Sequence, residues 1–291
     1  MAPPRRPREG ETTPPAFLAV GHAVRDLTPG GWRWGGAAVY AARTAARWGV
    51  ATALLTAGRG VPRGRGVEVV CKRGPTGTTF VNLYEGGRRR QRLLARAPSL
   101  EPEDLPEAWR QASLVLLAPV AQEVSPAFIG LFPRATLAAA IQGWLRAWSP
   151  EGIVYPCPLP DGFPLDGLDV LIASREDVED PGWFTLWARR VPLVVMTMGR
   201  AGAILWERGV ASPVSTVPVE EVDPTGAGDV FAAVFLLRLG EGCGAREAAL
   251  WASAAGALCV RRPGLAGVPS RRQVAALLTT PAWQGLRGSP G

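Results

Sequence analysis

The sequence is poor in the residues that build metal and redox sites. It has one histidine, His22, and four cysteines, none of which stands in a CxxC pair. A zinc site made of cysteine and histidine therefore lacks correctly spaced ligands. Lysine is equally scarce, because Lys72 is the only one and arginine supplies nearly all of the positive charge. Isolated thiols are typical of reduced cysteines in a cytoplasmic protein, which is the location we predict.

Two further absences concern partners. No apolar run approaches the roughly 18 residues of a membrane-spanning helix, so we expect no membrane partner. The net charge is +7, but the densest basic run, Arg88–Arg92, is short and contains no aromatic residue. A nucleic-acid-binding surface typically needs a larger basic patch. This run favours a solvated face or a lid over an anionic ligand, and we expect no nucleic-acid partner.

Short apolar runs alternate with helical segments along most of the chain. Runs of strand length occupy residues 16–20, 51–56, 114–117, 136–141, 170–173 and 193–197. The alanine-rich segment 37–48 has helical spacing and stops at Gly49, a typical helix end. This alternation predicts one α/β domain with a mostly parallel sheet that is covered on both faces.

Two segments interrupt this alternation and predict a small β lid. Residues 67–71 and 76–92 are polar and β-branched, and the pair Gly86-Gly87 separates two strand-like pieces, which is a hairpin signal. We predict a disordered tail at 1–15, a single domain at 16–280 with lid segments at about 22–34 and 67–95, and a C-terminal tail at 281–291. Residues 149–164 are rich in proline and glycine and predict a loop.

The most informative segment runs from Asp223 to Asp229, with the sequence Asp-Pro-Thr-Gly-Ala-Gly-Asp, and an apolar helix follows it. Residues Gly226, Ala227 and Gly228 have little or no side chain, so a ligand can approach their backbone. Because they stand where a helix begins, their N–H groups lack helical partners and predict an anion site. The carboxylate of Asp229, on the first turn, can accept a proton from a hydroxyl. Both requirements of phosphoryl transfer thus meet in one motif.

The competing interpretation of this segment is an ordinary capped helix in which Asp229 contacts only the backbone. A lone Gly-x-Gly-Asp would favour that interpretation, whereas the longer motif is far more specific. The chain has no Gly-x-x-x-x-Gly-Lys-Ser/Thr, which excludes a P-loop kinase. The single Gly-x-Gly within this motif has neither the preceding strand nor the acidic residue of a dinucleotide-binding fingerprint.

This motif closely resembles the signature of PfkB carbohydrate kinases, which include ribokinases, fructokinases, adenosine kinases and inositol kinases. The similarity extends from about Phe17 to Pro269. It implies a ribokinase-like, three-layer α/β/α fold with a small β lid, and an ATP-dependent phosphotransferase that acts on an alcohol group. By the same resemblance, Asp229 is the general base and the Gly226–Gly228 backbone is the anion hole.

Other strings extend the resemblance to the nucleotide side. The run Thr197-Met198-Gly199-Arg200-Ala201-Gly202 resembles the family's nucleotide segment, which implies contacts from Thr197, Gly199 and Gly202. Gly199 and Gly202 alone would be a generic strand-turn. The segment 174–177 falls where the family has Asn-x-x-Glu, which implies that Ser174 lies near the phosphates and Asp177 near Mg²⁺. Both side chains are shorter than those of the family, so we expect Mg²⁺ to be held through water.

The segment 261–264 resembles the late loop over the adenine, which implies that Gly264 lies at the nucleotide. In some family members this region holds a monovalent cation, and Asp223 and Thr225 would then contribute to a K⁺ site.

On the substrate side, local strings resemble the inositol-kinase branch more than ribokinase itself. These strings are Val20-Gly21-His22 with Asp26, Gly35-Gly36-Ala37-Ala38, Ile141-Gln142 with Arg146, and Ala173-Ser174 with Asp177. The resemblance implies that Asp26, Gly35, Gly36, Gln142 and Arg146 lie at the substrate, and Asn82, in the predicted lid, is a further candidate. Polar groups of this kind discriminate polyols because a wrong substrate leaves them unpaired. In isolation, Asp26 reads equally well as a surface residue in a turn, Asn82 as a strand residue, and His22 as structural.

Two departures from the family pattern affect the substrate more than the reaction. Ala140 stands where the related branch has an aspartate, and Tyr40 stands where ribokinases have asparagine. The alternatives are therefore a ribose, fructose or nucleoside kinase of the same fold, and a catalytically silent protein that binds a nucleotide or sugar as a regulator. The resemblance is compatible with a monomer or with a homodimer paired through lid edges.

Overall fold

The computed structural model describes residues 14–28, 30–62, 64–85 and 88–287, with the side chains of 83–85, 88–90 and 287 excepted. Most of the predicted tail at 1–15 lies outside this range. Within the described ranges, no helix combines the length and apolar character needed to cross a bilayer.

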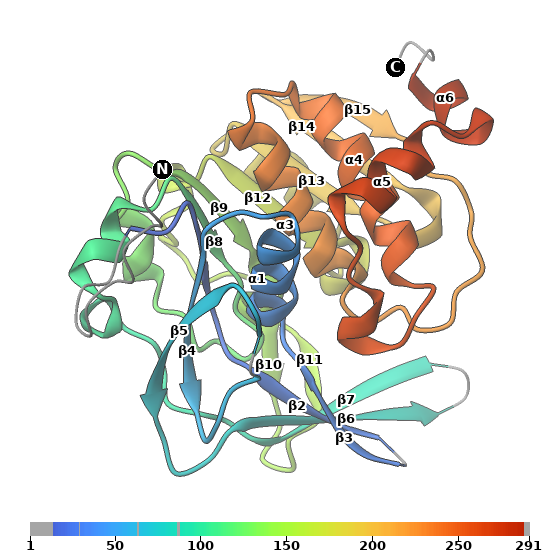
Figure 1. Cartoon of the computed structure of the whole chain (residues 1–291). Helices are drawn as coiled ribbons and strands as arrows, with labels where there is room; N and C mark the ends of the chain where they lie inside the picture. The colour runs from blue at the N-terminus through green and yellow to red at the C-terminus, as the bar shows by residue number, and fades with distance from the viewer. Residues whose placement is uncertain (1–13, 29, 63, 86–87, 288–291) are drawn as a thin grey trace, which may run out of the picture.

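A nine-stranded central sheet organises the chain (Figure 1). In spatial order its strands are β15 (Val210–Val214), β14 (Ala203–Glu207), β13 (Leu193–Thr197), β12 (Val170–Ser174), β9 (Thr136–Ala140), β8 (Leu114–Leu117), β1 (Phe17–Val20), β4 (Thr52–Gly58) and β5 (Val67–Arg73). All neighbours from β13 to β5 pair in parallel, and β14 and β15 add antiparallel strands at one edge. The six strands predicted from apolar runs all belong to this sheet.

The inner strands from β13 to β4 are mostly apolar because both faces of the sheet are covered there. In β1, Phe17 and Ala19 belong to one apolar cluster and Leu18 and Val20 to the other. The first cluster packs against helices α1 (Ala37–Arg47), α3 (Ala227–Gly240), α4 (Ala245–Cys259), α5 (Arg271–Leu278) and α6 (Pro281–Arg287). Figure 1 shows α1, α3 and α4 together on one side of the sheet.

The opposite face is covered by less regular structure. Helix α2 (Gly182–Trp187) contributes Phe184 and Trp187 to the second cluster. Short 3₁₀ helices also border this face or the ends of its strands, at Pro102–Asp104, Glu107–Gln111, Pro126–Gly130, Ile141–Leu145, Leu165–Gly167, Arg175–Asp177 and Gly199–Ala201. A further 3₁₀ helix, Gly264–Gly267, lies against α4 and β3 instead. The fold is thus three-layered, as predicted, with long helices on one side only.

A second sheet of four strands forms the lid, which projects from one end of the central sheet (Figure 1). Its order is β3 (Gly31–Gly35), β2 (Val24–Thr28), β6 (Thr78–Glu85) and β7 (Arg88–Ala95). The second predicted lid segment, 67–95, is wrong for 67–73, because those residues form β5 and pair with β4 in the central sheet.

Two other segments differ from their predicted character. Residues 281–287, which the sequence suggests to be a tail, form α6, and Trp283 on that helix is buried against the apolar cluster. The predicted loop at 149–164 contains part of a small antiparallel pair, β10 (Arg146–Trp148) and β11 (Val154–Pro156). In both cases tertiary packing supplies what local propensity does not.

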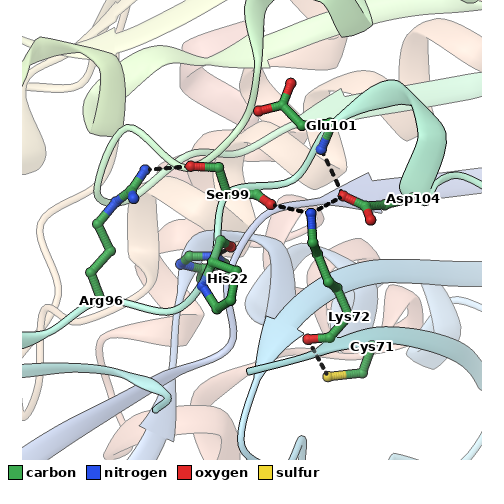
Figure 2. Close-up of polar contacts among 8 residues, drawn as sticks. His22, Cys71, Lys72, Arg96, Ser99, Glu101 and Asp104 are labelled. Carbon is green, nitrogen blue, oxygen red and sulfur yellow. Dashed lines mark hydrogen bonds and ion pairs between the residues drawn. The ribbon is translucent and has the colours of Figure 1, made fainter. Parts of the chain in front are cut away.

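The base of the lid is held by polar contacts. The chain leaves the lid through residues 96–101, where Arg96 donates to the hydroxyl of Ser99 and Lys72 donates to the Ser99 carbonyl at 2.9 Å. Lys72 also pairs with Asp104 at 2.8 Å. Figure 2 shows these side chains and His22 grouped at this point. They connect the edge strand β5 to the outgoing chain, so the lid leaves the sheet in a defined direction.

His22 lies fully buried at the same junction. Its Nε2 donates to the Pro98 carbonyl at 2.9 Å, which leaves Nδ1 to accept from the Thr78 hydroxyl at 2.7 Å. The Thr78 oxygen in turn accepts from the Ala97 N–H. Burial lowers the pKa of His22, an effect that outweighs the nearby Glu123 carboxylate. A neutral imidazole therefore joins the first lid strand to the third and to the outgoing chain.

Candidate active site

The carboxyl ends of the parallel strands place most predicted site residues along one edge of the sheet. Strand β1 leads to Gly21 and His22, β9 leads to Gln142, and β12 ends at Ser174. Strand β13 ends at Thr197, before the turn that carries Gly199 and Gly202. The lid rises from the same end through Val24 and Thr78. Residues far apart in sequence can therefore meet at this edge.

The motif at 223–229 forms the beginning of α3. Gly226 is the N-cap residue and has φ = 83°, a left-handed conformation that side chains rarely adopt. A Cβ at this position would lie 2.2 Å from a ring carbon of Tyr40. Only glycine fits there, since the Tyr40 ring packs directly against its backbone. Close packing against Tyr40 is therefore a reason for glycine at position 226, in addition to the predicted role of its N–H group in binding an anion.

The amides at the start of α3 are only partly available. Among the described residues, the N–H groups of Gly226 and Gly228 form no hydrogen bond, and a Cβ on Gly228 would meet open space. The Ala227 N–H, by contrast, closes a turn by donating to the Pro224 carbonyl at 3.3 Å. Of the three amides predicted to bind an anion, those of Gly226 and Gly228 are unbonded within the described part of the chain and that of Ala227 is used in a turn, and the anion site stays a prediction. Residue 227 contributes through the shape of the turn.

Asp229 stands on the first turn of α3 and is half-buried. Burial, together with the carboxylates of Asp229, Asp223 and Asp26, raises the pKa of the Tyr40 hydroxyl. The charges of the predicted base, the predicted substrate aspartate and the first aspartate of the motif therefore all act on the Tyr40 hydroxyl. The three carboxylates come from α3, from β2 and from the loop before α3.

Asp223 is buried and fully engaged. Its Oδ1 accepts from the Thr225 N–H at 3.0 Å, and its Oδ2 accepts from the Gly264 N–H at 3.0 Å. Oδ2 also pairs with Arg33 Nη1 at 2.9 Å. Burial alone would raise the pKa of Asp223, but hydrogen bonds from Thr225 and Gly264 and the charge of Arg33 hold it below its usual value. The motif, the late loop and the lid therefore meet at this carboxylate.

Arg33 is a residue of this site that the sequence does not reveal. In the lid it stands opposite Asp26, because β2 and β3 pair in antiparallel register. The two side chains belong to the same face of the lid sheet. No motif distinguishes this arginine from the other arginines of the chain.

The predicted diglycine has a steric reason. A Cβ on Gly35 would lie 2.1 Å from Asp26 Oδ2, and a Cβ on Gly36 would lie 2.4 Å from the His22 carbonyl oxygen. Gly36 also has φ = 100° and caps α1. Asp26 is buried under this bare backbone. The structure therefore brings together three of the residues predicted at the substrate.

A second group of predicted residues meets at the ends of β9 and β12. Gln142 Nε2 donates to Asp177 Oδ1 at 2.9 Å, and the Ser174 N–H donates to Asp177 Oδ2 at 3.0 Å. Ser174 and Asp177 form a reciprocal capping box on the 3₁₀ helix that begins there. Arg146 donates to the Val120 carbonyl at 3.3 Å. A substrate residue and a metal residue of the prediction are thus direct neighbours.

The remaining predicted residues are placed by backbone geometry. Gly199 and Gly202 have φ values of 54° and 87°, and a Cβ on Gly202 would lie 2.3 Å from the Val214 carbonyl oxygen. Thr197 donates to the Ala173 carbonyl at 3.5 Å. Asn82 lies on lid strand β6, where its Oδ1 accepts from Gln91 Nε2 at 3.1 Å. The turn itself requires Gly199 and Gly202, so the presence of these two glycines does not by itself indicate a nucleotide site.

Two cavities lie away from these residues. One, of about 650 Å³, is bordered by residues from 122–126 and 157–163, and the other, of about 230 Å³, by Arg47, Arg261, Arg262 and residues 266–269. None of the predicted site residues lines either of them. Within the described part of the chain, no group of three or more histidine, cysteine or acidic side chains is arranged to hold a metal ion.

Residues 183–271 match the model of the pfkB family carbohydrate kinases, and this stretch contains the motif at 223–229. The resemblance to the PfkB family is confirmed. The chain is 33% identical over 192 residues to inositol 3-kinase of Zea mays, which covers 64% of the chain and 49% of that relative. It is 37% identical over 92 residues to a ribokinase of Arabidopsis thaliana, covering 30% and 24%. The chain spans about half the length of the inositol 3-kinases that it matches.

Solved structures confirm the predicted ribokinase-like fold. A pyrophosphate-dependent kinase in the ribokinase family superposes with a TM-score of 0.74 at 22% identity, over 90% of this chain and 99% of that one. Ribokinase of Arabidopsis thaliana, complexed with ribose and ATP, superposes with a TM-score of 0.70 at 21% identity, over 92% and 100%. At these identities the likeness concerns the fold.

Proposed function

We propose that this chain transfers the terminal phosphoryl group of ATP to a hydroxyl of a small polyol or sugar. The observation that carries the proposal is the placement of a half-buried carboxylate, Asp229, beside the N–H groups of Gly226 and Gly228, which form no hydrogen bond among the described residues, at the start of one helix. A carboxylate beside an anion site is what a hydroxyl nucleophile and a phosphoryl group require together. The PfkB match over 183–271 supports the same chemistry.

In this mechanism Asp229 takes the proton of the substrate hydroxyl while the hydroxyl oxygen attacks the γ-phosphorus of ATP, and the bond from that phosphorus to the bridging oxygen breaks to release ADP. The N–H groups of Gly226 and Gly228, at the positive end of α3, stabilise the negative charge on the transferred group. Mg²⁺ neutralises part of the phosphate charge when it is bound. Asp177 would hold that ion through water, because Gln142 and the Ser174 N–H already use its two oxygens.

The acceptor that we favour is inositol-like. Asp26 offers a carboxylate beneath Gly35, and Gln142 and Arg146 offer an amide and a guanidinium at the end of β9. Asn82 would approach from the lid. The 33% and 34% identity to two plant inositol 3-kinases supports this class of acceptor. The matches to a ribokinase and a fructokinase support ribose and fructose as alternative acceptors, and a nucleoside stays an alternative from the family resemblance.

The test is a turnover screen with the purified chain. Inositols, sugars and nucleosides are each supplied with Mg²⁺ and either ATP or pyrophosphate, since a pyrophosphate-dependent kinase shares the fold. We expect ATP turnover to be fastest with an inositol. Turnover with pyrophosphate alone would correct the donor. Nucleotide or sugar binding without turnover of any acceptor would favour a silent regulator. Cytoplasmic location and the monomer or homodimer state stay predictions.

A further inference from the structure

The cation site that the resemblance implies at Asp223 conflicts with the contacts made by that side chain. Oδ1 accepts one backbone N–H, and Oδ2 accepts a second N–H and a guanidinium nitrogen, all within 3.0 Å. A bound K⁺ would need this carboxylate as an oxygen ligand. Its negative charge is already balanced by the arginine, and a further cation beside Arg33 would be repelled. The residues present therefore do not fit a monovalent cation held by Asp223.

Arg33 is built into this position. Its side chain is 38% exposed, whereas that of Asp223 is only 10% exposed. A Cβ on Gly264 would lie 3.6 Å from Arg33 Cδ and 3.9 Å from the Tyr40 hydroxyl oxygen. The arginine thus reaches from the lid across the late loop to the wall formed by Tyr40 and Gly226. Among the described residues, its buried Nε has no hydrogen-bond partner.

An arginine in this place differs from a dissolved cation in two ways. The guanidinium keeps its charge at every pH that the fold tolerates, and it cannot diffuse away. It is also carried by β3, an edge strand of the lid, so the charge reaches Asp223 only when the lid lies against the motif. The position of the lid and the electrostatics at the start of α3 are therefore linked through one side chain.

We propose that Arg33 is the resident cation of Asp223, which replaces a monovalent metal ion and makes phosphoryl transfer by this chain independent of K⁺. The measurement of kcat/KM rests on the proposed kinase function, whereas the measurement of the thermal midpoint does not. Arg33 acts here as a positioning residue, because it holds the carboxylate that orders Thr225 and Gly264 around the anion site.

The experiment compares the wild type with R33M, R33K and R73M. R73M is the control, because it removes one arginine charge at an exposed position at the end of β5, away from Asp223. Each protein is assayed in KCl and in tetramethylammonium chloride at equal ionic strength. Two quantities are measured: the thermal midpoint without substrate, and kcat/KM for ATP with the best acceptor of the screen.

We expect the thermal midpoint and kcat/KM of the wild type to be the same in KCl and in tetramethylammonium chloride. The same should hold for R73M. R33M should lose kcat/KM by at least about tenfold in tetramethylammonium, the size of effect that follows loss of one partner of a hydrogen-bonded charge pair. R33K, which keeps the charge, should recover much of this loss. The conservative variant thereby separates a charge effect from simple unfolding of the lid.

Either of two results would overturn the inference. One is a rate or midpoint of the wild type that rises with K⁺ but not with tetramethylammonium. The other is an R33M protein that behaves like R73M in both assays. If the wild type turns over no acceptor, the proposed kinase function fails, while a midpoint of the wild type that rises with K⁺ but not with tetramethylammonium would still overturn the inference about Arg33.

Discussion

The start of α3 and the base of the lid reach a defined geometry by different means. The body of α3, from Val230 to Leu237, is buried and apolar, and it packs between α1 and α4. The base of the lid contributes Val24, Phe80 and Leu93 to the apolar cluster, and polar contacts of His22, Arg96 and Lys72 add to this packing. Packing therefore positions the base and the anion site, whereas packing together with hydrogen bonds and charge positions the lid. The two regions should respond to different substitutions.

The largest effect expected at the packed end comes from D229N. The variant keeps the shape of the side chain but cannot accept the hydroxyl proton, so we expect kcat to fall by about 10²–10⁴-fold. ATP binding, measured by calorimetry, should change little because the amides of Gly226 and Gly228 remain. A rate within threefold of the wild type would show that Asp229 is not the base.

The next effect is steric and should appear in stability. G226A places a methyl group 2.2 Å from the Tyr40 ring at a backbone φ of 83°. Strain and overpacking together should cost about 3 kcal/mol of unfolding free energy, measured with urea. G228A is the matched control for stability, since its methyl group meets open space. An equal loss in both variants would argue against the packing explanation.

At the polar end, the buried His22 should make stability depend on pH. Burial lowers its pKa in the folded state, so the unfolded chain takes up the proton first as the pH falls below about 6.5. The free energy of unfolding should therefore decrease from pH 6.5 down to the folded pKa, and be unaffected by this group above pH 6.5. Urea titrations at several pH values measure the slope. The slope should flatten in H22N, and an unchanged slope would assign it to other groups.

The smallest effect should come from the ion pair at the lid base. Lys72 and Asp104 are both partly exposed, and pairs of this kind contribute about 0–1 kcal/mol. K72M should therefore lower the unfolding free energy by no more than about 1 kcal/mol. Because Lys72 also holds the Ser99 carbonyl, the loss should show first as faster amide exchange near residues 96–101. Unchanged exchange there would mean that His22 and Arg96 suffice to hold the lid.

The predicted elements that proved right have strong local signals. The apolar runs became central strands because a strand covered on both faces must be apolar along its whole length. The failures are equally physical. Residues 67–73 are polar enough to resemble a lid strand, yet they occupy a sheet edge where one side meets solvent. Residues 281–287 look like a tail until Trp283 finds a buried site on the apolar cluster.

By itself, the sequence determined the layered α/β fold, the helix that begins after residue 226, and the carboxylate on its first turn. These features depend on short stretches whose apolar pattern and glycines permit few other conformations. Only the tertiary structure decided that Arg33 pairs with Asp223, that Tyr40 packs on Gly226, and that Gln142 meets Asp177. Each of these pairs joins residues far apart in the chain. Their contact depends on the path of the lid and on the sheet order, which no local pattern encodes.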